Sequence, residues 1–257
     1  MQSEHFITNS GEKSLSKILN GILPKSDDLD FLVGYFYFSG INEIREYIGD
    51  KKMRILVGME IEKELQNITA EFDFFQRKKL SSKQEIRNDY YQRFATFFNH
   101  TDFFETQQQQ EVFKLYFNKI KDGTLEIRKT KEPCHAKMYI FTFKDDYSED
   151  GENLGNVITG SSNLTYNGLR GQNEINVRFK NNPEYKDALQ IFETLWQNAT
   201  VIADKDHIDD FVEGVIAKIW LDKYPAPYLM YLRCLYEYFN IDTSKRIRTP
   251  HDITKGK

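Results

Sequence analysis

The chain has 257 residues and a formal net charge of −4 at pH 7, with 29% charged and 40% hydrophobic residues. This length can bury a full core, and the composition is that of a soluble globular protein rather than a disordered chain. The acidic balance argues against a uniformly basic nucleic-acid binder but allows a local basic cleft with modest, salt-dependent binding. No apolar run reaches the length of a membrane span, and the start lacks a signal-peptide pattern. Cys134 and Cys234 lie far apart, so we expect reduced thiols and a cytoplasmic location.

The first quarter of the chain predicts a helix and then a strand–helix–strand unit. The expected elements are a helix over 13–23, a strand over 31–38, a short helix over 41–48 and a strand over 54–59. Both strands are short, continuous apolar runs, which is typical of strands buried on both faces. A unit of this kind favours parallel pairing of its two strands.

Residues 60–121 have a different character and predict a helical insert. This region has no glycine and is rich in Lys, Gln, Phe and Tyr. Apolar residues recur at helical spacing, which indicates amphipathic helices over about 62–79, 82–98 and 107–121.

The second half predicts strands again, followed by helices. The expected strands cover 124–129, 137–143, 156–160 and 173–179, and the expected helices cover 185–197, 207–219 and 227–239. Residues 243–257 are polar and basic and lack core-forming side chains, which is typical of a linker or a frayed end. We therefore expect one domain over 1–242 and a basic tail over 243–257.

A histidine and a lysine stand two residues apart at the start of one predicted strand. His135, Lys137 and Tyr139 alternate with Ala136 and Met138. Alternate residues of a strand share a face, so the imidazole and the ammonium should enter one pocket. This pair suits attack on a phosphate diester by a histidine nitrogen, with the lysine neutralising the phosphoryl oxygens.

His135-x-Lys137, followed by Gly160-Ser161-Ser162-Asn163 and then Glu174, resembles the HxK…GSxN signature of the phospholipase D superfamily. The spacing to Glu174 most resembles its nuclease branch, which includes metal-independent restriction endonucleases and nuclease domains attached to helicases. The lipase-type motif has an Asp five residues after the Lys. Thr142 stands there in this chain, which favours a nuclease over a lipase. The resemblance implies an α/β fold with a mixed β-sheet flanked by helices, interrupted by the helical insert.

The resemblance also implies four catalytic residues. His135 would be the nucleophile and form a phosphohistidine. Lys137 and Asn163 would hold the non-bridging oxygens of the phosphate. Glu174 would accept a hydrogen bond from the distal ring N–H of His135, fixing its tautomer and stabilising the cationic ring.

Ser161, Ser162 and Tyr139 are expected to bind substrate. Either serine could add a hydroxyl to the phosphate site, and the sequence leaves open which of them faces it. The same residues have ordinary interpretations: the glycine–serine–serine–asparagine run could be a plain turn, and Tyr139 could simply pack.

One copy of the HxK motif implies a dimer. The superfamily mechanism needs a second histidine as general acid for the leaving oxygen. The remaining histidines, His5, His100, His207 and His251, have no HxK context. We therefore expect a two-fold homodimer in which His135 of each subunit faces a composite site. No metal-ligand cluster lies near the motif, so we expect neither a metal nor another cofactor.

The sequence as a whole predicts a metal-independent phosphodiesterase, an endonuclease acting on nucleic acid, with DNA favoured over RNA. A role in phage defence or restriction, and an attached helicase as a partner, follow from family analogy alone. Two alternatives stay open. One is a DNA-binding and dimerisation module of a helicase with little catalysis, and the other is a phospholipid-processing enzyme. Strand preference, sequence specificity and membership of a longer protein are not encoded in any motif that we find.

Overall fold

The computed structural model describes one unit of the chain. The described residues are 5–8, 14–34, 40, 42–58, 82–100, 107–147, 153–164, 168–169 and 174–215. Contacts divide the chain into Met1–Ile219 and Trp220–Lys257, and every described residue belongs to the first unit. The helices predicted over 62–79 and 227–239, and the tail over 243–257, lie outside the described residues.

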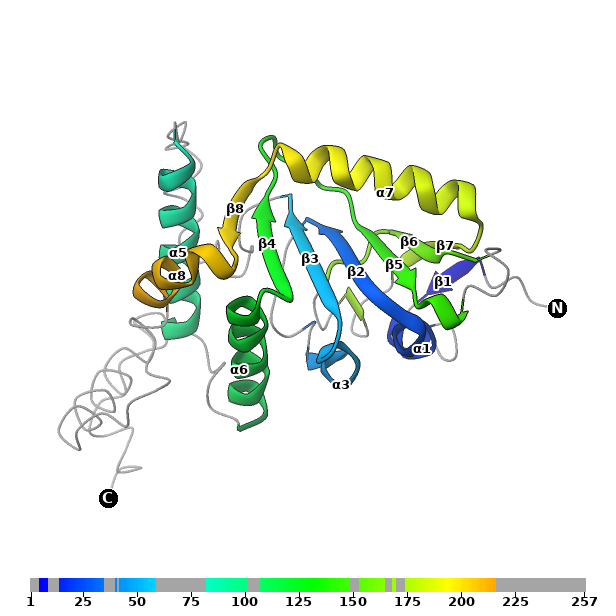
Figure 1. The fold of residues 1–257 in the computed structure, drawn as a ribbon, viewed down its shortest axis with the longest axis horizontal. Coiled ribbons are helices and arrows are strands. Elements are labelled where there is room, and N and C mark those ends of the chain that lie inside the picture. Colours follow the sequence, from blue (N-terminus) through cyan, green and yellow to red (C-terminus); the bar gives the residue numbers. More distant parts are fainter. Residues whose placement is uncertain are drawn as a thin grey trace, which may run out of the picture. The chain divides into compact units, whose positions relative to one another are not determined.

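The described strands form one mixed sheet (Figure 1). They are β1 (Phe6–Thr8), β2 (Ser26–Val33), β3 (Lys52–Val57), β4 (Leu125–Lys129), β5 (Met138–Phe143), β6 (Gly155–Gly160), β7 (Ile175–Phe179) and β8 (Thr200–Ala203). Their order across the sheet is β1-β7-β6-β5-β2-β3-β4-β8. The β2–β3 and β3–β4 pairs are parallel, which confirms the predicted pairing of the strand–helix–strand unit. The other neighbouring pairs are antiparallel.

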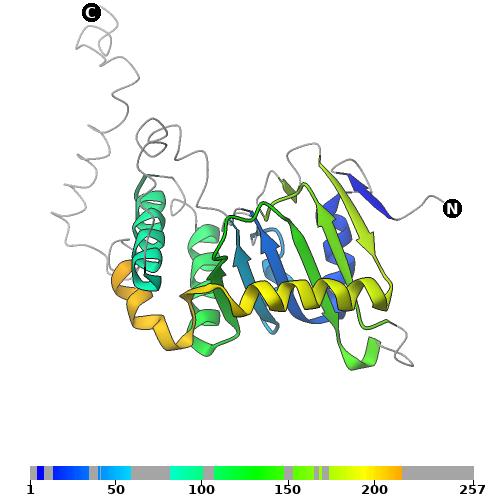
Figure 2. The same cartoon turned by 90° about the horizontal axis from the view of Figure 1, so that it is seen from above.

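Helices lie on both faces of this sheet. They are α1 (Leu15–Ile22), α3 (Arg45–Ile48), α5 (Lys83–His100), α6 (Gln107–Asp122), α7 (Asn182–Gln197) and α8 (Ile208–Gly214). Helix α7 runs along one face, and α1 and α6 lie on the opposite side (Figures 1 and 2). The predicted helices over 82–98 and 107–121 are α5 and α6. They lie in the connection that carries the chain from β3 to its parallel neighbour β4.

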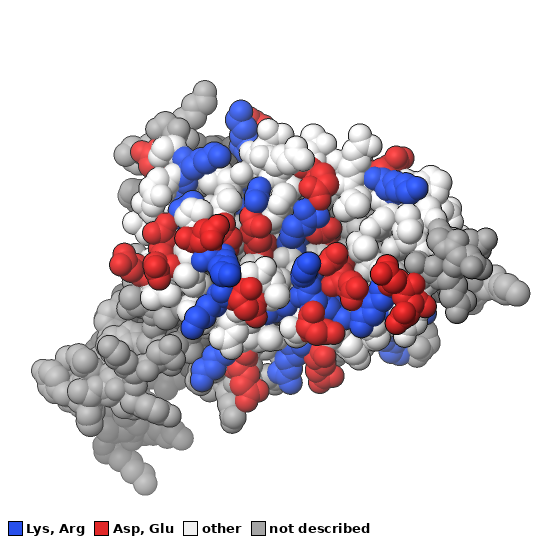
Figure 3. Space-filling model, viewed as in Figure 1, with Lys and Arg blue, Asp and Glu red and all other residues white. Residues whose placement is uncertain are grey.

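One face of the described part mixes both signs of charge. On the face seen in Figure 3, lysines and arginines are interspersed with aspartates and glutamates. This face therefore creates no broad basic field, and attraction for a polyanion on it has to arise locally.

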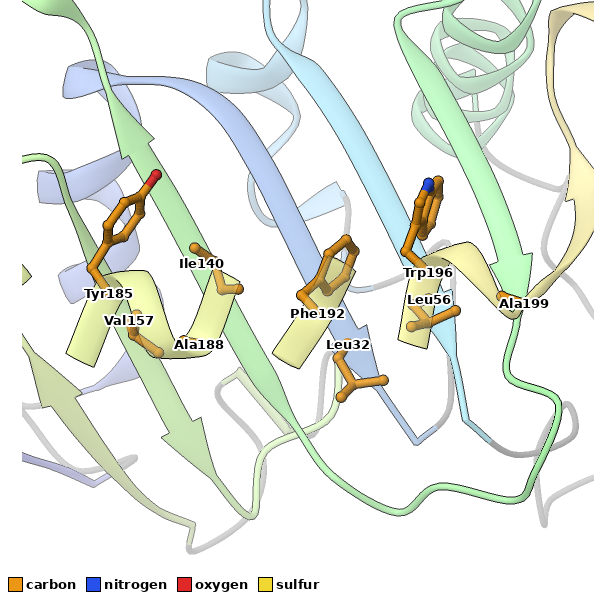
Figure 4. Packing of buried hydrophobic residues seen from close by; sticks show 9 residues of the cluster. All are labelled: Leu32, Leu56, Ile140, Val157, Tyr185, Ala188, Phe192, Trp196 and Ala199. Atoms are coloured by element: carbon orange, nitrogen blue, oxygen red, sulfur yellow. The ribbon is translucent and has the colours of Figure 1, made fainter. Parts of the chain in front are cut away.

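Helix α7 shows how the sequence builds one layer of the core. Pro183 stands in its first turn, where its fixed φ and missing N–H are tolerated. Its buried residues are spaced along one helical stripe and are Tyr185, Ala188, Phe192 and Trp196. They pack onto the strand residues Leu32, Leu56, Ile140 and Val157 (Figure 4).

The other face of the central strands is equally apolar. Phe31, Ile55 and Tyr139 alternate with the residues beneath α7 and are fully buried. The rings of Phe31 and Tyr139 meet edge to face, with their centroids 5.1 Å apart. Because the end of β2 is covered on both faces, its last three residues, Phe31–Val33, are all apolar and buried.

Arg54 of β3 links the buried Asp30 of the sheet to the more exposed Glu193 of α7. Its Nε donates to Asp30 Oδ1 at 2.6 Å, and its Nη2 donates to Asp30 Oδ2 at 2.9 Å and to Glu193 Oε1 at 2.6 Å. The guanidinium also lies 5.0 Å from the ring centroid of Phe192 and 5.3 Å from that of Trp196. Burial raises the pKa of Asp30, and Arg54 opposes this shift.

Candidate active site

The strand directions bring the separate sequence motifs to one edge of the sheet. Parallel β2 and β3 end at this edge, antiparallel β5 starts there, β6 ends there and β7 starts there. The register pairs Leu32 with Met138, Met138 with Thr159, and Thr159 with Val177. We call this edge of the sheet the catalytic edge. Just beyond its last paired strand residues lie His135, Lys137, the turn 161–163 and Glu174.

His135 and Lys137 lie just before β5 rather than inside it. The strand begins at Met138, one residue later than predicted. Lys137 is 4% exposed, whereas His135 is exposed. Their side chains still meet: Lys137 Nζ lies 3.0 Å from Nδ1 and 2.9 Å from Nε2 of His135, and it donates to the carbonyl oxygen of His135 at 2.8 Å. The tautomer of the ring decides which nitrogen accepts.

Gly34, directly after β2, shows that Asn163 belongs to the same group. A Cβ at residue 34 would lie 3.2 Å from Asn163 Oδ1, 3.5 Å from His135 Cδ2 and 3.5 Å from Lys137 Nζ. Three predicted catalytic side chains therefore surround one point. This point is open to them because residue 34 has no side chain.

Burial changes the acid–base properties of Lys137. Removal of the ammonium from water lowers the pKa of Lys137, and the negative charge of Glu174 opposes this shift. Glu174 therefore lies within electrostatic range of the lysine, as a shared catalytic pocket requires. A partly desolvated ammonium also attracts an incoming phosphate more strongly than a solvated one would.

The structure separates the two serines of the turn. Ser161 is exposed, and its Oγ donates to Glu174 Oε2, while its backbone N–H donates to Ile175 O at 3.1 Å. Ser162 is fully buried. Its backbone and side chain are bound by Asn176 and Tyr139. Of the two, Ser161 is the serine that can reach a substrate.

Two expected substrate contacts are therefore wrong. Tyr139 is 0% exposed, packs against Phe31 and donates from its hydroxyl to Ser162 O at 2.9 Å. Tyr139 follows Lys137 by two residues, which is why the two were expected to share a pocket. At Tyr139, however, the strand is already covered by the hydrophobic core. Ser162 is equally inaccessible, so both residues support the turn instead of contacting a ligand. The contact predicted from Glu174 to the His135 ring stays a prediction.

Thr142, at the position of the lipase-type Asp, lies away from the catalytic edge. Its hydroxyl and that of Tyr185 share a hydrogen bond of 2.7 Å, which ties β5 to α7. The presence of Thr142 instead of the lipase-type Asp therefore affects a contact between β5 and α7, and the His135–Lys137 pair does not depend on it.

Two of the other histidines lie elsewhere. His5 Nδ1 lies 3.3 Å from Arg178 O, three residues along β7 from its start at the catalytic edge. His207 Nδ1 contacts Asp204 Oδ1 at 2.6 Å, beyond β8. The side chain of His100, and all of His251, lie outside the described residues.

The described residues lack two kinds of feature. They contain no cluster of three or more His, Cys, Asp or Glu side chains suited to holding a metal ion. None of their helices is both long and apolar enough to cross a membrane.

Comparison with known families agrees with the geometry. A family described as "Cardiolipin synthase, PLD-like domain" matches residues 53–196, more than half of the chain, from β3 through α7 and across every motif residue. The chain belongs to the phospholipase D-like family. This confirms the phospholipase D-like phosphodiesterase superfamily and the expected α/β fold.

Several solved structures are similar to this chain. Nuc, a phospholipase D family member from Salmonella typhimurium, is 12% identical with a TM-score of 0.39, over 76% of this chain and 95% of that one. NucT from Helicobacter pylori is 12% identical with a TM-score of 0.41, over 76% and 96%. The phosphatidylserine synthase from Haemophilus influenzae is 16% identical with a TM-score of 0.44, over 91% of this chain and 45% of that one. No curated protein matches the chain.

Proposed function

We propose that the protein is a phosphodiesterase that hydrolyses nucleic acid, DNA in preference to RNA, through a phosphohistidine on His135 and without a metal ion. The observation that supports this most is the convergence of His135, Lys137 and Asn163 around the point beside Gly34. A nucleophile and a cation beside an amide side chain are the kinds of group that phosphoryl transfer needs.

The reaction has two displacements. In the first, a neutral ring nitrogen of His135 attacks phosphorus; the P–N bond forms and the P–O bond to the leaving strand breaks. In the second, water attacks phosphorus; the new P–O bond forms and the P–N bond breaks, which returns the imidazole. Lys137 and Asn163 stabilise the charge on the non-bridging oxygens in both steps.

The leaving oxygen must take a proton, which a second histidine supplies. That histidine then accepts a proton from the attacking water, so the protons balance over the cycle. His5 and His207 lie away from the catalytic edge. We assign this role to His135 of a second copy of the chain, related by a two-fold axis.

Nucleic acid is favoured over phospholipid by the motif itself. Glu174 and Thr142 are the residues that match the nuclease branch rather than the lipase branch. Lys129 and Lys131 at the carboxyl end of β4 lie on the same edge of the sheet as the site, where they can contact a phosphate backbone. We further propose a role in phage defence or restriction, which rests on family analogy.

The test is a cleavage assay in excess EDTA on labelled single- and double-stranded DNA and RNA, with phospholipid vesicles as a parallel substrate. We expect cleavage of DNA that chelation does not reduce, because Lys137 supplies the charge that a metal would. Loss of cleavage in EDTA and its return with Mg²⁺ or Mn²⁺ would refute the metal-independent mechanism. Hydrolysis of the lipid alone would assign a different substrate, and DNA binding without cleavage would leave a binding module.

His135→Ala, with His207→Ala as its matched control, tests the nucleophile. We expect His135→Ala to lose at least about 10³-fold in rate, because nucleophile and general acid vanish together in a symmetric dimer. His135 is exposed, so the truncation leaves no buried cavity and the fold should persist. His207→Ala should cleave at the wild-type rate. A wild-type rate from His135→Ala would remove this residue from the mechanism.

A further inference from the structure

We propose that Asn176 and Tyr139 are positioning residues that fix the turn 161–163, and thereby the place of Asn163 beside Lys137 and His135. The inference rests on the proposed function for its catalytic readout. A different observation supports it: the backbone N–H, the hydroxyl oxygen and the carbonyl oxygen of the buried residue Ser162 are all hydrogen-bonded.

Ser162 is held at three atoms. Its backbone N–H donates to Asn176 Oδ1 at 3.2 Å, its Oγ accepts from Asn176 Nδ2 at 2.9 Å, and its carbonyl oxygen accepts from Tyr139 Oη at 2.9 Å. All three residues are 0% exposed, so water cannot replace these bonds. The centre of the turn is therefore fixed from two strands at once, β5 and β7.

Only an amide side chain serves at residue 176. The backbone N–H of Ser162 can only donate, which assigns the acceptor Oδ1 to it and leaves Nδ2 as the donor to Oγ. Asparagine offers both atoms in one short planar group, whereas alanine offers neither. Gly160, the register partner of Asn176, makes room for this group, because a Cβ there would lie 2.6 Å from Asn176 Oδ1.

The two residues that flank Ser162 carry the proposed chemistry. Ser161 bonds to the carboxylate of Glu174 on one side, and Asn163 lies beside Lys137 and His135 on the other. When the centre of the turn is fixed, the amide of Asn163 is directed at the point where the phosphate oxygens would lie. A catalytic group displaced by about 1 Å can lose roughly 10²-fold in rate.

The experiment compares Asn176→Ala and Tyr139→Phe with the matched control Asn156→Ala. Asn156 is also a buried asparagine of this sheet, 1% exposed on β6, and it pairs with Phe141 away from the catalytic edge. In the orientation that satisfies its amide, it donates to Phe179 O at 3.3 Å. Its loss should lower the melting temperature and leave the turn in place.

Two readouts separate positioning from general damage. The first is kcat and KM on bis(4-nitrophenyl) phosphate, a phosphodiester without base or lipid. We expect Asn176→Ala to lower kcat by about 10²-fold with KM changed by less than about threefold. Tyr139→Phe removes one of the three bonds and should lower kcat by about tenfold. Asn156→Ala should keep kcat.

The second readout is amide hydrogen exchange over residues 160–164, which needs no activity. Exchange there should speed up in Asn176→Ala and Tyr139→Phe and stay unchanged in Asn156→Ala. Unchanged exchange in Tyr139→Phe, or a wild-type kcat in a folded Asn176→Ala, would overturn the proposal. If the wild-type protein hydrolyses no phosphodiester, the proposed function fails, and the exchange comparison still decides whether these residues hold the turn.

Discussion

At the scale of single residues, two of the buried lysines in the described part of the chain have opposite consequences. Lys119 of α6 is 2% exposed and donates to Lys51 O at 2.6 Å and to Thr124 Oγ1 at 3.1 Å. Lys137 is as deeply buried, but its neighbour His135 is exposed and can exchange its hydrogen bonds with water. Burial lowers the pKa of both lysines. Lys119 satisfies buried acceptors, whereas the ammonium of Lys137 lies beside an exposed histidine, as the proposed phosphate site requires.

Lys137→Met should abolish cleavage and raise stability at neutral pH. A lysine whose folded pKa is lowered binds fewer protons in the folded state than in the unfolded state. Its charge therefore opposes folding fully below the folded pKa, and this penalty fades as the pH rises toward the ordinary value of about 10.4. The stability advantage of Lys137→Met should accordingly be largest near pH 7 and shrink as the pH approaches 10.

Urea unfolding of wild type and variant at several pH values measures this difference. Lys119→Met is the matched control, and it should destabilise by about 1–3 kcal/mol, because it leaves buried oxygens unsatisfied, while it retains cleavage. If Lys137→Met is less stable than wild type at pH 7, the ammonium stabilises the folded state and our account of the site is wrong.

At the scale of elements, the end of β2 decides whether the proposed catalytic residues can meet. A methyl at Gly34 would lie 3.2 Å from Asn163 Oδ1, which is closer than ordinary contact, so Asn163 would have to shift. Gly34→Ala should therefore lower kcat/KM by about tenfold or more and leave the melting temperature nearly unchanged. The control is Gly21→Ala in α1, where nothing lies within 4 Å and helix propensity predicts a gain of about 0.5–1 kcal/mol.

Arg54 fixes α7 to the sheet and gives an element-scale prediction of stability. Arg54→Met would leave Asp30 buried without its partner, so we expect a loss of about 3–5 kcal/mol in the free energy of unfolding. Arg54→Lys keeps the charge but loses the bidentate hydrogen bond to Asp30, so its free energy of unfolding should lie between those of wild type and Arg54→Met. Thermal or urea unfolding measures both variants. Equal stability of Arg54→Met and wild type would show that this ion pair does not stabilise the fold.

Periodicity predicted the elements that bury a full face and missed those that do not. The strand predicted over 137–143 begins one residue later, at Met138. The strand predicted over 31–38 is β2, which covers Ser26–Val33, because its polar first half gave no apolar signal. β1 and β8 were missed because they are short edge strands, and β1 pairs with β7, which is more than 160 residues away. No local pattern encodes a pairing at that separation.

The candidate site also shows that local sequence patterns reveal local features and miss those that depend on distant strand pairing. His135, Lys137 and Asn163 were predicted together because they stand in a recognisable local motif, and the structure brings their side chains around one point, while their catalytic roles stay predictions. Gly34 and Asn176 were missed because only the strand register brings them to the motif. A glycine directly after a buried apolar run was the one signal available for Gly34. Tyr139 was misassigned because alternation identifies the face of a strand but not where along it the core begins.

At the scale of the whole molecule, a single HxK motif and a reaction that needs two histidines predict a homodimer with a composite site. Light scattering at micromolar concentration should give about twice the chain mass of 30.4 kDa. A strictly monomeric protein that still cleaves would contradict the shared site.

Mixed dimers test how the two subunits share the work. A dimer with one wild-type subunit and one His135→Ala subunit keeps either the nucleophile or the general acid at a shared site, never both. We expect its rate to fall at least about 10²-fold below wild type, because the loss of either role removes a full catalytic contribution. Two independent sites would instead leave half of the activity. The two subunits can be given different affinity tags and purified in tandem, and His207→Ala mixed with wild type serves as the matched control. A mixed dimer at half the wild-type rate would place a complete site within each chain and would require a general acid other than the second His135.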